Sequence, residues 1–335
     1  MYKQELAIIV QSIIESNTIS NHAKCAKTLS DFYKKINSVT FSQDNETAVN
    51  GGIALSSLGA ADCVDDYLRT VFFIKGIYKA LTKLCRDFPD RSINVLYAGC
   101  GPYATLILPL LPLFDKERIN AVLIDINAVS IVSVQELLKV TGLDEYEIQL
   151  LEADAITYTI PENFQIDLAI SETMDYALKN EPQVAIVQNI APQLPAHGIL
   201  IPQEIRVDFM YTFFDYEPYL KNAVTEVQDY NNLQSYPHGV FVDRLFTINK
   251  ELFAKTNPIY KFESDFYKLP DNFKDHPDLC IFTEIKIFDD VELKTAESYI
   301  TNPYCVASRY SLDHSEIQLV YDFSGIPQWS YNLKN

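Results

Sequence analysis

Two glycines separated by a single residue, Gly99 and Gly101, stand out in a chain of 335 residues that holds only ten glycines. Apolar residues precede them, and the apolar run 104–114 follows, which predicts a strand, a tight turn and a helix start. Such a turn lets the backbone approach a ligand, and a helix N-terminus favours polar or anionic groups. A second apolar run, 121–127, holds Asp125 at a predicted strand end, where an acid can bind ribose hydroxyls. The pattern predicts a site for a nucleoside-containing cofactor.

The glycine turn admits two interpretations. Gly99-x-Gly101-x-x-Ala104 satisfies a dinucleotide fingerprint, which is a weak signal by itself. The same stretch resembles more closely the first motif of the class I S-adenosylmethionine (SAM) methyltransferases, an apolar strand and an acid followed by G-x-G-x-G. Tyr97 stands at the position of the acid and Tyr103 at that of the third glycine.

A third acid continues the series. Residues 151–160 are predicted to hold a strand end and a turn, and Asp154 lies where the resemblance implies a hydrogen bond to the adenine amine. A fourth strand is predicted at 164–172. Each acid alone could equally cap a helix or face solvent. The ordered series favours a ligand site, because ligands of open parallel sheets bind outside the carboxyl ends of the strands.

The most specific segment is SETMDYALKNE, residues 171–181. It resembles the double-E loop of the protein arginine methyltransferases, S-E-x-M-x-Y-x-L-x-x-E, in which two glutamates clamp the substrate guanidinium. Glu172 and Glu181 match these glutamates. Two carboxylates can hold a planar cation in a fixed geometry and aim its nitrogen at a methyl donor. The resemblance implies that Glu172 and Glu181 are catalytic, and that the acceptor is bound by Glu172, Met174, Asp175, Tyr176 and Glu181.

Two flanking segments resemble the same family. Residues 67–70, YLRT, resemble its E-x-R-T element, in which Arg69 would bind the cofactor carboxylate. Residues 197–207 resemble the G-x-x-x-P passage from which the family's chain enters a β-barrel. The resemblance covers about residues 65–207 well and the remainder only in architecture. It implies that SAM is bound by Arg69, Gly99, Cys100, Gly101, Asp125, Ile126, Asp154, Ala155 and Glu172.

The sequence also departs from that family. Our alignment puts residues 279–281, Leu-Cys-Ile, at its Thr-His-Trp loop, which leaves no imidazole or indole there, and His276 is out of register. Asp175 replaces a glycine and adds a third acid. Residues 50–63, rich in small side chains, take the place of an N-terminal tyrosine motif and suit a lid. These departures favour a small-molecule or peptide acceptor over a histone-like tail.

Composition limits the possible partners. The net charge of −18 argues against binding to a nucleic-acid backbone and is compatible with a cationic acceptor. The six cysteines include no C-x-x-C pair, so we expect no metal site, and scattered single thiols fit a reducing cytoplasm. No signal peptide and no run of about 18 apolar residues is evident, so we expect a soluble, cytoplasmic protein without a membrane partner.

The elements that must position these residues follow from periodicity. Residues 1–37 are predicted to form two helices, 38–52 a loop, and 60–85 a helix that leads to the first strand. Strands then alternate with helices to about residue 200, as in a parallel sheet, and aromatic, β-branched runs follow. A helix predicted at 217–230 lies where the family has its dimerisation arm, so a homodimer is possible.

We therefore expect an α/β fold with a doubly wound, Rossmann-like, mainly parallel sheet, a helical N-terminal extension and a C-terminal antiparallel β-rich domain. Three domains are predicted: a helical extension or lid at 1–60, a SAM-binding domain at 61–204, and a barrel-like substrate or oligomerisation domain at 205–335.

The predicted function is the SAM-dependent transfer of a methyl group to a guanidine or amine nitrogen of a small molecule or peptide. Four alternatives remain open. They are a protein arginine N-methyltransferase, an aminocarboxypropyl transferase similar to nicotianamine synthases, which share the G-x-G-P turn of residues 99–102, an NAD-linked oxidoreductase, and a SAM-binding scaffold without catalysis.

Overall fold

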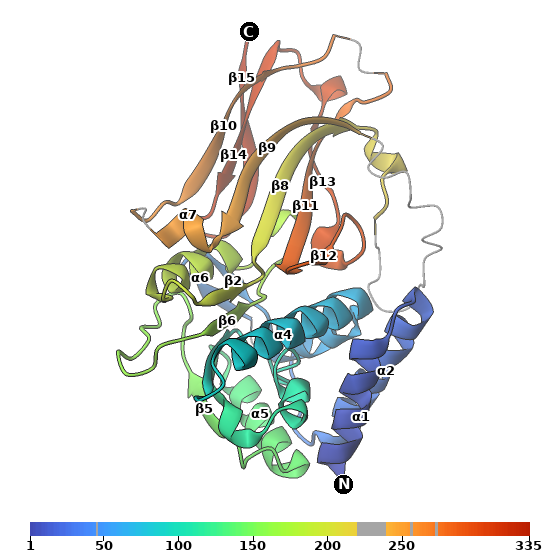
Figure 1. The fold of residues 1–335 in the computed structure, drawn as a ribbon. Helices are drawn as coiled ribbons and strands as arrows, with labels where there is room; N and C mark the ends of the chain where they lie inside the picture. The colour runs from blue at the N-terminus through green and yellow to red at the C-terminus, as the bar shows by residue number, and fades with distance from the viewer. Residues whose placement is uncertain (45, 220–238, 255–256, 272–273) are drawn as a thin grey trace.

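The computed structural model describes residues 1–335 except 45, 220–238, 255–256 and 272–273. Helices and a parallel sheet form one half of the molecule, and antiparallel strands form the other (Figure 1). The two chain ends lie at opposite ends of the molecule (Figure 1). The predicted helix 217–230 lies mostly outside the described residues.

The N-terminal region forms the two predicted helices, α1 (Tyr2–Glu15) and α2 (Ile19–Ile36), which pack on each other and on α4 (Tyr67–Asp87). The prediction that α4 begins near residue 60 is wrong. A short helix, α3 (Ser57–Asp62), and a 3-10 turn precede it, and α4 starts where the Asp66 carboxylate accepts the amide of Arg69. Such an N-cap satisfies one of the free amides of the first turn.

The parallel sheet has the strand order β5-β4-β3-β6-β7. Its strands are β3 (Ile93–Ala98), β4 (Ile119–Asp125), β5 (Glu147–Glu152), β6 (Leu168–Ser171) and β7 (Ile199–Ile201), and every pairing is parallel. The helices α5 (Ala128–Thr141) and α6 (Gln183–Ile190) connect strands. The chain order reverses between β3 and β6, and the crevice at such a switch point is where open sheets bind ligands.

Two local predictions are wrong. The apolar run after the glycine turn forms a 3-10 helix, η2 (Leu108–Leu113), because Pro109 and Pro112 have no amide hydrogen to donate to an α-helical ladder. No α-helix N-terminus therefore follows the glycine turn. The loop predicted at 38–52 holds most of a small hairpin, β1 (Thr47–Val49) and β2 (Gly52–Ala54).

The C-terminal region is antiparallel throughout its described residues. One sheet contains β8 (Glu204–Thr212), β9 (Val240–Asn249), β11 (Asp278–Phe288), β12 (Val291–Leu293) and β13 (Tyr304–Ser308). The other contains β10 (Lys261–Lys268), β14 (Glu316–Asp322) and β15 (Gln328–Lys334), and the short helix α7 (Lys250–Ala254) lies between β9 and β10. Burial alternates along β14, as it does in a strand with one face on the core.

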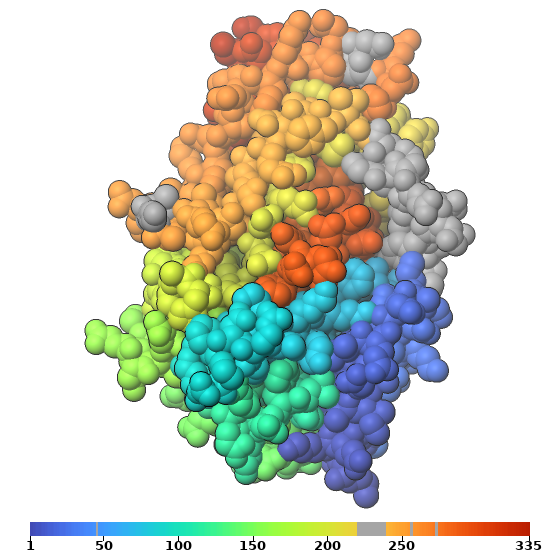
Figure 2. Space-filling model, viewed as in Figure 1, coloured from blue at the N-terminus to red at the C-terminus, as the bar shows by residue number. Residues whose placement is uncertain are grey.

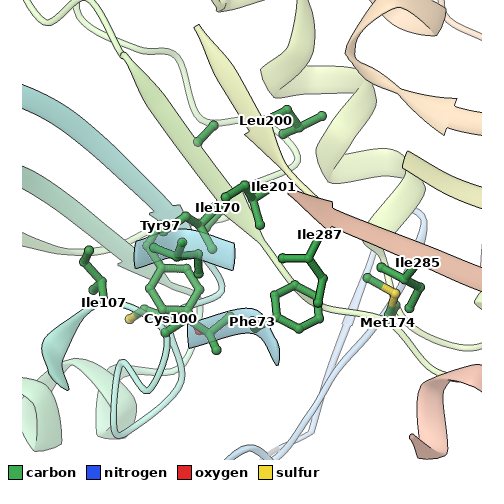
Figure 3. Packing of buried hydrophobic residues seen from close by; sticks show 14 of the residues in the cluster. Phe73, Tyr97, Cys100, Ile107, Ile170, Met174, Leu200, Ile201, Ile285 and Ile287 are labelled. Carbon is green, nitrogen blue, oxygen red and sulfur yellow. The ribbon is translucent and has the colours of Figure 1, made fainter. Parts of the chain in front are cut away.

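One continuous hydrophobic core joins the two halves. Side chains from α4, the parallel sheet and β11, including Phe73, Ile170 and Ile287, gather in one cluster (Figure 3). The surface shows the orange-red residues of the β region directly against the cyan helix α4 (Figure 2). A Cβ atom at Gly76 of α4 would lie 2.4 Å from Ile287 Cγ2, so this glycine permits the close contact. The domain boundaries at 60 and 204 stay predictions.

No helix among the described residues is long and apolar enough to cross a membrane.

Candidate functional site

A cavity of about 600 Å³ opens at the carboxyl ends of β3, β4, β5 and β6. Its volume lies in the range of small-ligand sites, about 300–1,000 Å³. Every predicted site residue except one lines it: Arg69, Gly99, Cys100, Gly101, Asp125, Ile126, Asp154, Ala155, Glu172, Met174, Asp175 and Glu181. The exception, Tyr176, lies outside the lining and packs edge-on against the ring of Tyr299, 5.5 Å away.

The glycine turn is fixed to the neighbouring strand. Gly99 and Gly101 have φ values of +70° and +62°, which glycine adopts without the strain of a side chain. The amides of Gly99 and Cys100 both donate to the carbonyl oxygen of Ile124, at 2.9 and 3.0 Å. The Gly101 amide donates to the Asp125 carboxylate at 2.8 Å. These bonds hold the turn open toward the cavity.

The two tyrosines that depart from the glycine motif also line the cavity. Tyr103 stacks on Tyr33 of α2, with ring centroids 4.8 Å apart, and Tyr97 is almost wholly buried. The N-terminal helices therefore support one wall of the site.

The acids at the strand ends each hold a local turn. Asp125 also accepts the amide of Asn127 at 2.8 Å, and Asp154 accepts that of Ile156 at 2.9 Å. Burial raises the pKa of Asp125, while the amides of Asn127 and Gly101 oppose that rise. Both carboxylates face the cavity, where their oxygens can accept hydrogen bonds from hydroxyl or amine donors.

Glu172 and Arg69 form an ion pair in the cavity wall. Glu172 is only 5% exposed, and Arg69 also donates from Nη1 to the carbonyl oxygen of Cys63 at 3.0 Å. Burial disfavours the charge of Arg69, but nearby anionic groups, Asp66 among them, raise its pKa above its ordinary value. Within the described part of the chain, the buried Arg69 Nε has no hydrogen-bond partner. The guanidinium therefore keeps a donor for a further acceptor.

Glu181 has different surroundings. Burial raises its pKa to about 8, the nearby Asp175 adds to this, and Arg69 opposes it. The Asp175 carboxylate accepts the amide of Tyr176 at 2.7 Å and the side-chain amide of Asn180 at 2.6 Å. Eight acidic side chains, Glu172, Asp175 and Glu181 among them, thus line the cavity with one guanidinium, an excess of acids that favours a cationic ligand.

The loop that carries these acids runs from β6 to α6 in an unusual conformation. Ala177, Leu178 and Asn180 have φ values of 54°, 57° and 61°, in the left-handed region that residues other than glycine rarely adopt. At its base, the Gln183 side chain accepts the amide of Thr173 at 2.9 Å and donates to a β6 carbonyl. Surrounding contacts must offset the cost of this conformation.

Some lining residues escaped the sequence analysis. Tyr299 and Ile300, in the 3-10 turn η8 (Tyr299–Thr301), reach the cavity from the β region. Residues 279–281, which our alignment puts at the Thr-His-Trp loop, lie inside β11, are fully buried and do not line the cavity. A signal was present: Ser298 and Thr301 form a capping box, which S-x-x-T spacing can also produce.

The hairpin β1–β2 was missed as well, and its Val49, Ile53 and Ala54 line the cavity. The Asn50-Gly51 pair between its strands is a strong hairpin signal. The amide of Ile53 donates to the carbonyl oxygen of Asn180 at 2.8 Å. This bond joins the hairpin to the loop 172–181, called the acidic loop below.

No family model matches the chain, and no curated protein matches it. Among solved structures, protein arginine methyltransferase 10 of Arabidopsis thaliana is similar, with 13% identity, 82% of this chain and 96% of that chain covered, and a TM-score of 0.50. The chain has the fold of the protein arginine methyltransferases. The PRMT1 enzyme–prozyme heterotetrameric complex of Trypanosoma brucei with AdoHcy is similar at 12% identity, with 81% and 96% covered. Its TM-score of 0.48 is too low to carry an argument. The predicted fold class is confirmed.

Proposed function

We propose that this protein is a SAM-dependent methyltransferase that modifies a guanidine or amine nitrogen of a cationic acceptor. The observation that carries the proposal is the cavity itself. It joins a glycine turn and strand-end acids, suited to a nucleoside, to the acids Glu172 and Glu181, which line the same cavity. The fold, similar to that of an arginine methyltransferase, supports the same conclusion.

The residues present fit SAM. Arg69, whose Nε has no partner among the described residues, would hold the cofactor carboxylate. Asp125 would accept the ribose hydroxyls and Asp154 the adenine amine, and the turn at Gly99 and Gly101 lets the backbone lie close to the cofactor. Cys100, Ile126 and Ala155 would complete the walls. When bound, SAM supplies an electrophilic methyl group on a sulfonium.

The two glutamates would bind and orient the acceptor, and one of them would also accept its proton. Ionised Glu172 and Glu181 accept hydrogen bonds from the acceptor cation and fix the direction of its reactive nitrogen. Glu181, with a pKa near 8, is also suited to take the proton that this nitrogen releases as it gains the methyl group. Met174 and Asp175 line the same cavity, and Tyr176 would act indirectly through Tyr299.

The class of acceptor is a further part of the proposal. We infer a small-molecule or peptide acceptor, because the Thr-His-Trp loop of the family has no counterpart in this sequence. A protein arginine acceptor is the second candidate, supported by the match of SETMDYALKNE to the double-E loop. A homodimer and a cytoplasmic location stay predictions.

Calorimetry with SAM, its demethylated product S-adenosylhomocysteine and NAD tests the cofactor. We expect heat with the first two and none with NAD, and a stabilisation of about 2.7 kcal/mol at 100 times the dissociation constant. Mass spectrometry of reactions with guanidine and amine acceptors then identifies the product. S-adenosylhomocysteine supports the proposal, and methylthioadenosine would instead indicate aminocarboxypropyl transfer. Binding of NAD alone, or of none of the three, would overturn the proposal.

A further inference from the structure

The C-terminal hairpin β14–β15 brings two buried side-chain donors to the acidic loop. Trp329 donates from Nε1 to the carbonyl oxygen of Ala177 at 2.9 Å. The hydroxyl of Tyr321 donates to the next carbonyl oxygen, that of Leu178, at 2.6 Å. Tyr321 and Trp329 are register partners across the two strands, with ring centroids 5.0 Å apart. One rung of the hairpin therefore binds two consecutive peptide groups of the loop.

Those two peptide groups belong to the left-handed part of the loop, where Ala177 and Leu178 are both fully buried. A buried carbonyl that loses its donor destabilises the conformation that buries it. Without the two donors, the left-handed conformation would add its own cost to that of two unsatisfied carbonyls. The bonds thus select this loop conformation over less strained ones.

A third contact comes from the same hairpin. The amide of Asn180, the residue before Glu181, donates to the carbonyl oxygen of Pro327 at 3.0 Å. The contacts of β14–β15 with the loop therefore end one residue from the carboxylate that would receive the acceptor.

The aromatic rings already have packing partners. Trp329 and Tyr321 lie against Phe246, with centroids 6.0 and 5.6 Å away. A phenylalanine at position 321 would keep this apolar contact, so the hydroxyl serves the loop alone. The polar atom can therefore be removed separately from the packing.

We propose that Tyr321 and Trp329 are positioning residues of the acceptor site, which hold loop 172–181 so that Glu181 lies opposite Glu172. The chemical part of this inference rests on the proposed methyl transfer, whereas the conformational part does not. Neither side chain lines the cavity, and both act through the loop backbone.

The test compares Tyr321→Phe and Trp329→Phe with a matched control, Tyr146→Phe. The Tyr146 hydroxyl also donates to backbone carbonyls, those of Leu111 and Phe114 at 2.7 and 2.8 Å, but Tyr146 does not line the cavity. Hydrogen exchange of the loop amides is measured in the full-length protein. We expect exchange at 176–181 to quicken by about 10-fold or more in the first two variants and to stay unchanged in the control.

Kinetics provide the second measurement. We expect kcat to fall by roughly 10- to 100-fold in Tyr321→Phe, with SAM affinity unchanged, because a small misplacement of reacting groups has effects of that size. The acid limb of the pH profile should also move to lower pH, since a loosened loop exposes Glu181 to solvent. A general loss of stability would produce neither a selective kcat effect nor this shift.

The outcomes separate the two proposals. Loop exchange equal to wild type in both variants, or quickened equally in Tyr146→Phe, overturns the positioning role whatever the activity. A wild-type protein that transfers no methyl group overturns the proposed function, while the exchange measurement still decides the positioning role. If Trp329→Phe fails to fold, Tyr321→Phe alone decides, because it removes a single oxygen.

Discussion

Glu172 and Glu181 line the same cavity but have different charged neighbours. Arg69 neutralises Glu172, whereas Glu181 has Asp175 as its near neighbour and a pKa raised to about 8. Environments that separate two carboxylates in this way also separate their roles. Glu172 would stay paired with Arg69, and Glu181 would exchange a proton.

Glu181→Gln should lower kcat for a guanidine acceptor by about 100-fold, because the amide neither takes up a proton nor matches the charge of the cation. SAM affinity measured by calorimetry should change little. Glu162→Gln, which removes an exposed carboxylate outside the cavity, serves as the control. Equal rates for Glu181→Gln and wild type would exclude a catalytic role for Glu181.

The raised pKa of Glu181 also predicts how stability depends on pH. Between the ordinary value of 4.5 and about 8, the folded protein holds a proton that the unfolded chain has released. Stability should therefore fall as the pH rises through this window and level off above it, by on the order of 5 kcal/mol in total. Urea unfolding at pH 5 and pH 9 should show Glu181→Gln gaining on wild type at the higher pH. A constant difference between the two proteins would contradict the prediction.

The site residues on strand ends were predictable because apolar runs that end in glycine or an acid mark the carboxyl edge of a parallel sheet. Local sequence was therefore enough to predict Gly99, Asp125 and Asp154 at the cavity. The family resemblance was needed to predict Arg69 and Glu181 there. The capping box at Ser298 could have marked the turn that holds Tyr299, but not its place at the cavity. That place, and the contacts of Tyr321 and Trp329 with the loop, depend on segments more than 100 residues apart.

At the scale of elements, the hairpin β1–β2 presses directly on the acidic loop. A Cβ atom at Gly52 would lie 2.6 Å from the Pro182 nitrogen and 2.8 Å from the Glu181 carbonyl carbon. These are backbone atoms, which cannot rotate away as a side chain can. The hairpin thus contacts the end of the loop at residues 180–182, whereas β14–β15 binds residues 177 and 178.

Gly52→Ala should therefore shift the hairpin or the loop and destabilise the protein by about 1–3 kcal/mol, as overpacking does. Loss of methyl transfer should accompany the lower melting temperature. Gly325→Ala is the control, because a Cβ atom there meets nothing within 4 Å. If both variants melt and react like wild type, the close approach at Gly52 has no consequence.

Two elements show where the pattern of apolar residues predicts the wrong secondary structure. The run 104–114 has the apolar content of a helix, and its composition alone predicted one. Two prolines remove amide hydrogens within it, so the chain forms 3-10 turns instead. The hairpin at 47–54 was hidden for the opposite reason, since its short strands carry little periodic signal.

At the scale of the whole molecule, Asp66 links the two halves. Its carboxylate caps α4 and also accepts the Ser298 hydroxyl at 2.7 Å and the Tyr299 amide at 2.9 Å. Burial raises its pKa, and these hydrogen bonds oppose the rise. The link crosses from the helical half to the turn that lines the cavity.

Asp66→Asn should lower the free energy of unfolding by about 1–3 kcal/mol, because its amide group turns one buried acceptor into a donor that faces other donors. Ser298→Ala should cost less, since it removes the hydroxyl donor to Asp66 and the acceptor of the capping box but leaves no donors facing each other. Asp31→Asn, at an exposed ion pair with Lys27, should leave denaturant unfolding unchanged. Equal midpoints for all three variants would contradict the structural role of Asp66.

The division into a parallel and an antiparallel half followed from sequence texture, since each half has its own pattern of buried runs. How the halves meet did not follow, because that depends on the fit of particular surfaces, such as Gly76 against Ile287.

The hydrogen bonds from Tyr321 and Trp329 to the carbonyls of residues 177 and 178 have a consequence for synthesis of the chain. Because synthesis runs from the N-terminus, residues 171–181 leave the ribosome well before residue 329 exists. A chain that stops before residue 321 would lack both donors, so its loop 172–181 would have to find other partners. If the protein transfers a methyl group as proposed, we expect the transfer only once residues 321 and 329 have been synthesised.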